Sequence, residues 1–402
     1  MENPNDRILL EPATGINTSL YGLNLTKIVY NVYKIYVSLF RVLYIKVLIG
    51  FFMENITFGV VDQSPLRKGG TVRQALQETV KLAQIAEEVG YKRYWVAEHH
   101  NSGGYAGTSP EILIGQIAAQ TKHITVGSGG VMLSHYSALK VAENFSLLNS
   151  FYPDRIELGI GRAPGSDQLT AQALSYPKQL VDIQHFPQQV TDLIGYLSGS
   201  LPNEHIFSKI NSQPGPSPSS VPGIWLLGSS DYSARLAAIL GLPFSFADFF
   251  GTTAEHGPLI AKLYRDTFRP SGYIQEPKMN VALQVICAET EERAKFIASS
   301  RNISRINSLK GIREPMISPE EASSVKLNYL EEQHLENINK HSIMGTPETV
   351  KSKIIEAMKT YETTDVSIVT NCHHFEDRVK SFQLVAETFE LKTKFSSSSL
   401  EV

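Results

Sequence analysis

The chain is poor in cysteine and carries almost no excess charge. Only two of its 402 residues are cysteine, Cys287 and Cys372, and they lie far apart. This excludes a disulfide framework and favours a reducing compartment, which we take to be the cytoplasm. The 37 basic and 40 acidic residues are well mixed and leave a net charge of −3. We therefore expect no nucleic-acid partner and no acidic disordered tail.

Residues 20–52 lack acidic side chains altogether, unlike the rest of the chain, but contain Lys27, Lys34, Arg41 and Lys46. Residues 28–52 are long enough for a membrane anchor, although each basic residue near the bilayer centre would cost about 2.5–3.5 kcal/mol. They could instead form a basic targeting or surface-binding segment, but their β-branched and aromatic residues make a poor helix. The third interpretation, which we favour, is untranslated sequence before a true start at Met53. Residues 1–52 are then not part of the fold, and membrane association is expected only if residues 28–52 belong to the protein.

From Met53 to Leu391, eight short apolar segments alternate with segments of helical periodicity, and residues 392–402 form a Ser-rich tail. This alternation predicts an α/β fold, a (β/α)8 TIM-type barrel, with an open doubly wound sheet as the alternative. A proline-rich stretch (198–223) and a charged stretch (301–342) predict insertions after strands four and seven, the second one following a helix at about 291–299. The expected strands are Ile56–Asp62, Arg93–Glu98, Ile124–Val131, Arg155–Gly161, Gly223–Leu227, Phe244–Phe250, Met279–Ala288 and Asp365–Thr370.

Residues that can do chemistry stand at the ends of several expected strands, where such barrels build their active sites. His99 and His100 end the second strand, and histidine acts as an acid or a base near neutral pH. Because neighbouring strand residues point to opposite faces, at most one of the two faces the barrel axis, and the other could bond a neighbouring backbone. Gly129 and Gly130 interrupt the third strand, which indicates either a bulge or a flat surface that a ligand approaches.

Two further strand ends suit an anion. The turn after strand four presents Arg162, whose planar guanidinium can bind a phosphate through two hydrogen bonds. Ser229 and Ser230 follow strand five and begin a helix, whose free backbone donors favour an anion. Asp231 would repel an anion unless its side chain points away. Since strands four and five are neighbours, Arg162 and the two serines could hold one phosphate together.

A metal centre is a different possibility at the barrel mouth. Cys372, His373 and His374 end the eighth strand and could join Glu98 and the histidines of strand two. Adjacent histidines seldom bind one ion, however, and strands two and eight are not neighbours. We expect no metal, and a metal-dependent hydrolase remains the alternative from another functional class.

Several motifs together resemble the bacterial-luciferase-like family of flavin-dependent monooxygenases. The resemblance extends from Met53 to Leu391 and is strongest to the single-chain, non-luminescent oxidoreductases of that family. Each motif is weak alone, but the combination is specific. The motifs are Asp62–Pro65, Trp95–His100, Val126–Gly130, Gly159–Ala163, Gly161–Asp167, Leu227–Ser233 and Met344–Glu348.

The resemblance implies an α/β barrel that uses reduced FMN and O₂. It places a non-proline cis peptide at Gly129–Gly130, against the flavin ring. It implies that Arg162 and Ser230 hold the flavin phosphate, with Ala163 and Ser229 beside them. It also implies that His99 is catalytic and that His100 supports the site. Gly161 stands where bacterial luciferase has a reactive cysteine, so light emission is not implied.

The partners expected from this reading are a small substrate, a reductase and a second copy of the chain. The sequence contains no convincing nicotinamide site, so reduced FMN should come from a separate NAD(P)H:flavin reductase. Family members often dimerise, and a homodimer is expected here. Phe246, Phe249, Phe250 and Tyr105 near strand ends suit a small hydrophobic substrate such as an aldehyde or ketone. A deazaflavin-dependent oxidoreductase on the same barrel and a non-catalytic flavin-binding protein stay open as alternatives.

Overall fold

A ring of eight parallel strands forms the centre of the protein in the computed structural model, which describes residues 34, 56–163, 167–177, 183–215, 221–251 and 253–392. Because β1 pairs with both β2 and β9, and β6 pairs with β7, the sheet closes on itself. The closed ring confirms the expected (β/α)8 TIM-type barrel and excludes the open doubly wound sheet. The strands of the ring are β1 (Thr57–Asp62), β2 (Arg93–Val96), β3 (Thr125–Met132), β4 (Ile156–Gly161), β5 (Gly223–Gly228), β6 (Phe244–Ala247), β7 (Met279–Cys287) and β9 (Asp365–Val369).

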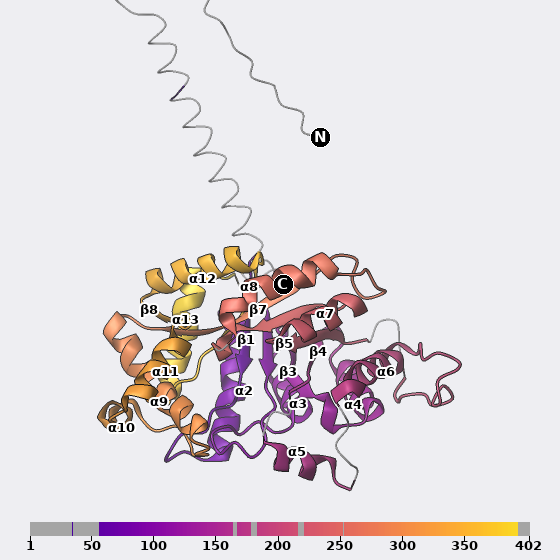
Figure 1. The fold of residues 1–402 in the computed structure, drawn as a ribbon, viewed down its shortest axis with the longest axis horizontal. Coiled ribbons are helices and arrows are strands. Elements are labelled where there is room, and N and C mark those ends of the chain that lie inside the picture. Colours follow the sequence, from indigo (N-terminus) through magenta and orange to yellow (C-terminus); the bar gives the residue numbers. More distant parts are fainter. Residues whose placement is uncertain are drawn as a thin grey trace, which may run out of the picture. The chain divides into compact units, whose positions relative to one another are not determined.

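Helices surround the ring (Figure 1). The sequence explains α2 well: Thr71 and Gln74 form a reciprocal capping box at its start, and Leu82, Ala83 and Ala86 bury one face. The helices that follow individual strands are α2 (Val72–Glu88), α3 (Pro110–Gln120), α4 (Ala138–Phe151), α6 (Phe186–Ser198), α7 (Asp231–Leu240), α8 (Gly257–Thr267), α12 (Pro347–Tyr361) and α13 (Phe375–Thr388).

The connections after β4 and β7 contain additional elements. The first contains α5 (Gln168–Ser175) and the short 3₁₀ helix η2 (Ile183–His185) before α6. The second contains α9 (Glu291–Leu309), α10 (Pro319–Ser324), α11 (Tyr329–Asn339) and the short strand β8 (Ile343–Gly345). β8 pairs only with the last residues of β7, so it lies outside the ring.

Two sequence-based boundaries were wrong. Helix α9 does not end near residue 299 but continues to Leu309, because Ile303 and Ile306 extend its buried apolar face. Arg301 and Arg305 beside these isoleucines hid the periodicity, and residues 301–309 belong to the helix rather than to the insertion. Strand β6 ends at Ala247 rather than Phe250, and η3 (Asp248–Phe250) follows, with buried Asp248 accepting a hydrogen bond from Tyr361 at 2.5 Å.

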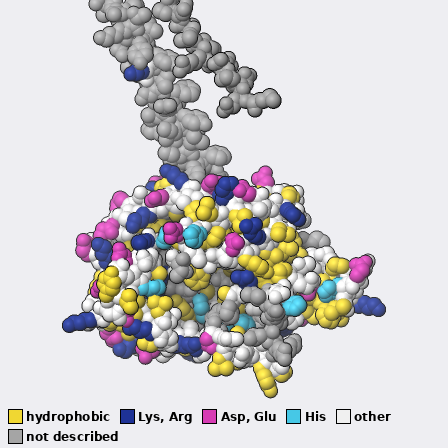
Figure 2. Space-filling view, in the orientation of Figure 1, with side chains coloured by type: hydrophobic (Ala, Val, Ile, Leu, Met, Phe, Trp, Pro, Cys, Tyr) yellow, Lys and Arg dark blue, Asp and Glu magenta, His cyan; other side chains and the backbone are white. Residues whose placement is uncertain are grey.

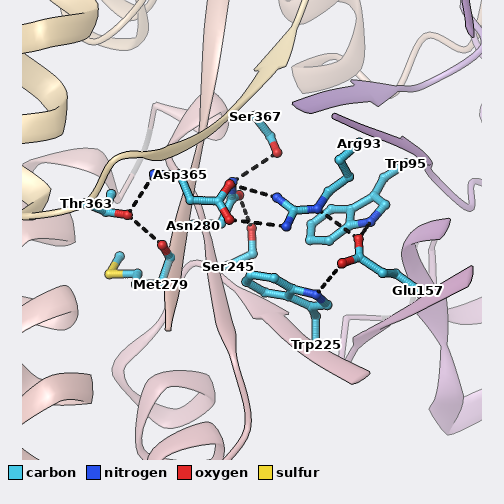
Figure 3. Close-up of polar contacts among 10 residues, drawn as sticks. All are labelled: Arg93, Trp95, Glu157, Trp225, Ser245, Met279, Asn280, Thr363, Asp365 and Ser367. Carbon is cyan, nitrogen blue, oxygen red and sulfur yellow. Dashed lines mark hydrogen bonds and ion pairs between the residues drawn. The ribbon is translucent and has the colours of Figure 1, made fainter. Parts of the chain in front are cut away.

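Arg93 lies at the centre of a polar cluster inside the amino-terminal end of the barrel (Figure 3). Its Nε donates to Glu157 at 2.8 Å, and its Nη1 donates to Asp365 at 2.7 Å. The guanidinium also lies against the rings of Trp95 and Trp225, 4.7 and 4.6 Å from their centroids. Burial lowers the pKa of Arg93, but the two carboxylates outweigh this and raise it. Further hydrogen bonds extend this cluster from Asp365 to the side chains of Asn280, Ser245 and Ser367. The cluster thus connects six strands near their amino-terminal ends.

The described residues contain no helix that is long and apolar enough to cross a membrane. Residues 1–52, apart from Lys34, lie outside the described residues. The three interpretations of that segment therefore remain predictions, as do the domain limits at Met53 and Leu391.

Candidate functional site

Glu98 connects two strand ends at the carboxyl-terminal mouth of the barrel. It lies beyond the end of β2 and is only 1% exposed. Its carboxylate accepts hydrogen bonds from the Met132 backbone N–H at 2.9 Å and from the Tyr136 hydroxyl at 2.7 Å, and it contacts His100 Nε2 at 2.8 Å. Burial and the neighbouring Glu98 carboxylate raise the pKa of Tyr136, which therefore stays a hydrogen-bond donor. The sequence suggested a metal-ligand role for Glu98 and gave no signal of this connecting role.

His99 points away from the Glu98 cluster. Its ring stacks on Tyr105, with centroids 4.5 Å apart, and its backbone N–H donates to the Gly107 carbonyl at 2.9 Å. Its Nδ1 is buried and has no hydrogen-bond partner. Burial lowers the pKa of His99 to about 4, so the imidazole is neutral at pH 7 and can exchange a hydrogen bond with a bound molecule.

The glycines of β3 form a bulge. The Gly129–Gly130 peptide is cis, as expected, and the register of β3 against β4 shifts there. A Cβ on Gly130 would lie 2.6 Å from the Gly159 carbonyl oxygen, so neighbouring backbone already occupies that side. A Cβ on Gly129 would lie 3.1 Å from Trp95 Cβ. Close packing between strands therefore explains why neither position carries a side chain, and the register shift shows the bulge. The approach of a ligand to this backbone stays a prediction.

The structure brings Arg162 to the first turn of α7. The guanidinium of Arg162 lies 4.2 Å from the centroid of the Tyr232 ring. Ser230 is the N-cap residue of α7, but its side chain makes no capping hydrogen bond. Asp231 is exposed and lies 3.8 Å from Arg235, which offsets its charge. An arginine and uncapped backbone donors at one helix start form a chemically suitable site for a phosphate.

The strand end at residues 372–374 forms no metal centre with the second strand. Cys372 is buried among Ile286, Ala288 and residues of α9, and burial raises the pKa of its thiol to about 12. His373 and His374 pack edge to face against each other. In the part of the chain that the structure describes, no three His, Cys, Asp or Glu residues are placed to hold a metal ion. The hydrolase alternative therefore has no ligand cluster in that part of the chain.

A cavity of about 550 Å³ opens at the barrel mouth, large enough for a small organic molecule. Both predicted histidines line it. The other polar side chains of the wall were not predicted, because they come from segments that are distant in the sequence, and Gln63 was noted only as part of the Asp62–Pro65 motif. They include Gln63, Gln284, Asn371, Arg301 and Arg305. Arg162, Ser229 and Ser230 are not among the residues that line this cavity.

Three of the four aromatic residues expected near a substrate line this cavity, namely Tyr105, Phe249 and Phe250. The assignment of Phe246 was wrong. Its side chain is fully buried and packs against Tyr361 of α12, with ring centroids 5.6 Å apart. The alternation of β6 turns this residue away from the barrel mouth and toward the outer helices.

Comparisons with known proteins identify the family. The family model described as luciferase-like monooxygenase matches residues 56–364. This chain belongs to the luciferase-like monooxygenase family. It is 38% identical over 336 residues to N-acetyl-S-alkylcysteine monooxygenase of Bacillus subtilis (strain 168), which covers 83% of this chain and 98% of that protein.

Solved structures of other proteins have the same fold. The crystal structure of apo-MsnO8 matches with a TM-score of 0.76 and 33% identity, covering 84% of this chain and 99% of the other. The oxygenating constituent of 3,6-diketocamphane monooxygenase from Pseudomonas putida, solved in complex with FMN, matches with a TM-score of 0.61 over 85% of this chain and all of the other. Its identity of 19% supports the fold alone.

Proposed function

We propose that this protein is an FMN-dependent monooxygenase that uses reduced FMN and O₂ to oxidise a small organic substrate with an apolar part. The observation that carries the proposal is the placement of Arg162 against the first turn of α7, where Ser230 leaves the helix start uncapped. The family membership supports the same chemistry. Solved proteins of this fold include one in complex with FMN, which supports FMN as the cofactor.

The chain's own residues would bind, orient and shield the reactants. Arg162, Ser229 and Ser230, with Ala163 beside them, would hold the phosphate, and the bulge at Gly129–Gly130 would face the flavin ring. Bound flavin supplies the oxygen chemistry, and the protein supplies position and a dry cavity. His99, neutral at pH 7, would exchange a proton or hydrogen bond with the substrate, while Glu98 holds His100 in place. Reduced FMN would come from a separate NAD(P)H:flavin reductase, and the active form would be a homodimer.

Equilibrium binding of FMN and riboflavin to the full chain tests the phosphate site. Because riboflavin lacks the phosphate, the wild-type protein should bind FMN more tightly, and Arg162→Ala should weaken FMN binding by about tenfold or more while leaving riboflavin unchanged. Absorbance and fluorescence of oxidised and photoreduced flavin give both constants. Equal affinities for the two flavins, or no effect of Arg162→Ala, would contradict the proposed site.

Turnover separates an enzyme from a non-catalytic flavin-binding protein. With photoreduced FMN and O₂, His99→Ala should keep flavin binding and lose oxidation of the substrate. Unchanged turnover in this variant would remove His99 from the mechanism. Oxidation of NAD(P)H by the purified chain alone would contradict the separate reductase.

A deazaflavin cofactor is the second candidate. It is favoured by one observation, the shared fold with an F420-dependent secondary alcohol dehydrogenase, at a TM-score of 0.56 and 14% identity. Binding of F420 in place of FMN in the same titration would transfer the proposal to a hydride-transferring oxidoreductase.

A further inference from the structure

Two arginines of α9 line the cavity without a carboxylate partner. Arg301 and Arg305 are one helical turn apart, and Arg301 is only 3% exposed. Among the described residues, neither guanidinium forms an ion pair with an acidic side chain. Burial first, and then the charge of Arg305, lower the pKa of Arg301 to about 9, so Arg301 still carries its charge at pH 7.

Hydrogen bonds hold both guanidinium groups and leave other donors free. Nη2 of Arg301 donates to Asn302 at 2.9 Å and to Asn339 at 2.8 Å, whereas its Nε and Nη1 are buried without a partner. Nη2 of Arg305 donates to the Phe249 carbonyl at 2.8 Å, and its Nη1 is likewise buried without a partner. Each side chain is therefore fixed in position with at least one N–H that faces no protein acceptor.

An unpaired buried charge such as Arg301 is costly in a folded protein, and the like charge of the partly buried Arg305 adds to this cost. The acids that line the same cavity do not fill this role. Asp167 accepts hydrogen bonds from Arg313 at 2.8 Å and from Thr170, and Glu314 is exposed. An anion bound in the cavity would supply the partner that none of the described acidic side chains provides.

The surroundings narrow the kind of anion. Arginine suits planar carboxylates, which accept two hydrogen bonds in its plane. Phe249 and Phe250 line the same cavity and present apolar surface to a bound molecule. Tyr105 connects the two sides of the cavity, since its ring stacks on His99 and its hydroxyl interacts electrostatically with Arg305.

We propose that Arg301 and Arg305 bind the carboxylate of an organic acid whose apolar chain lies beside Tyr105, Phe249 and His99. This inference rests on the proposed function, because it names the substrate class of that reaction. It also separates two anion sites, with the cofactor phosphate at Arg162 and the substrate carboxylate at α9.

Binding of hexanoate and of its neutral counterpart hexanamide to the full chain tests the inference by calorimetry without flavin. The wild-type protein should bind hexanoate at least about tenfold more tightly than hexanamide. Arg301→Met and, separately, Arg305→Met should abolish this preference. Arg293→Met is the matched control on the same helix, because Arg293 is paired with Asp377 and does not line the cavity. It should keep the preference unchanged.

Equal binding of hexanoate and hexanamide by the wild-type protein overturns the inference, as does a preference that survives in both cavity variants. Inorganic phosphate that displaces hexanoate and binds more tightly also overturns it, because the site would then be a phosphate site. If Arg301→Met does not fold, the inference is still tested by Arg305→Met and by the preference of the wild-type protein for hexanoate over hexanamide. Since no flavin is present, failure here leaves the FMN proposal standing, and failure of FMN binding leaves the carboxylate site standing.

Discussion

Arg93 and Arg301 are both almost completely buried, at 5% and 3% exposure, but their surroundings are opposite. At the amino-terminal end of the barrel, Arg93 lies between Glu157 and Asp365, and all of its neighbours are residues of the chain itself (Figure 3). At the carboxyl-terminal mouth, Arg301 keeps unpartnered donors beside a cavity. The charge of Arg93 is neutralised within the fold, whereas the charge of Arg301 would be neutralised only by a bound anion.

Over the part of the chain that the structure describes, the outer surface has neither a buried ion-pair cluster like that of Arg93 nor an unpaired buried charge like that of Arg301. Figure 2 shows acidic and basic side chains interspersed over the face that it draws, so their fields largely cancel. Such exposed pairs contribute little to stability or to binding. The contrast that matters for function therefore lies inside the barrel, between its two ends.

The largest expected effect on stability comes from removing Arg93 from its ion pairs at the amino-terminal end of the barrel. Arg93→Met leaves the carboxylates of Glu157 and Asp365 without their cation, and we expect the free energy of unfolding to fall by about 3–5 kcal/mol. Urea denaturation measures this. The exposed pair of Arg293 with Asp377 is the control, and Arg293→Met should change stability by less than about 1 kcal/mol. Equal effects of the two substitutions would show that the Arg93 cluster is not a structural centre.

At the mouth, the same type of substitution should have the opposite sign. Arg301→Met removes an unpaired buried charge and replaces it with an apolar side chain of similar length, so the free energy of unfolding should rise by about 0.5–2 kcal/mol. Denaturation of the ligand-free protein measures this gain. A loss of stability comparable to that of Arg93→Met would mean that Arg301 stabilises the fold through a partner within the protein, which would contradict its role as a ligand-binding residue.

A smaller effect should appear in the pH dependence of stability. The pKa of His99 is about 4 in the folded protein and lies near 6.5 when the chain is unfolded. Between these values the unfolded state binds the additional proton, so this group makes stability fall as the pH falls from about 6.5 to 4. His99→Gln should remove up to about 1.4 kcal/mol per pH unit from that slope. Parallel stability curves for wild type and variant would contradict the burial of a neutral imidazole.

Much of the mouth could be predicted because strand ends are local features. Glu98–His100 and the Gly129–Gly130 peptide were placed correctly toward the carboxyl-terminal end of the barrel, and the cis geometry followed from the family resemblance. The roles of His99, His100, Arg162 and Ser230 remain proposals. The cavity arginines could not be found in this way, because they lie in the charged stretch 301–342, which predicts an exposed insertion rather than a buried helix.

The sequence by itself determined the order of strands and helices, the helix caps such as Thr71 with Gln74, and the chemistry available at each strand end. These depend on residues a few positions apart, so local pattern is sufficient. Only the tertiary structure decided that Arg93 pairs with Asp365, 272 residues away, and that Arg301 pairs with no acidic side chain among the described residues. Whether a buried charge is paired depends on which distant segments the closed barrel brings together, and no local pattern carries that information.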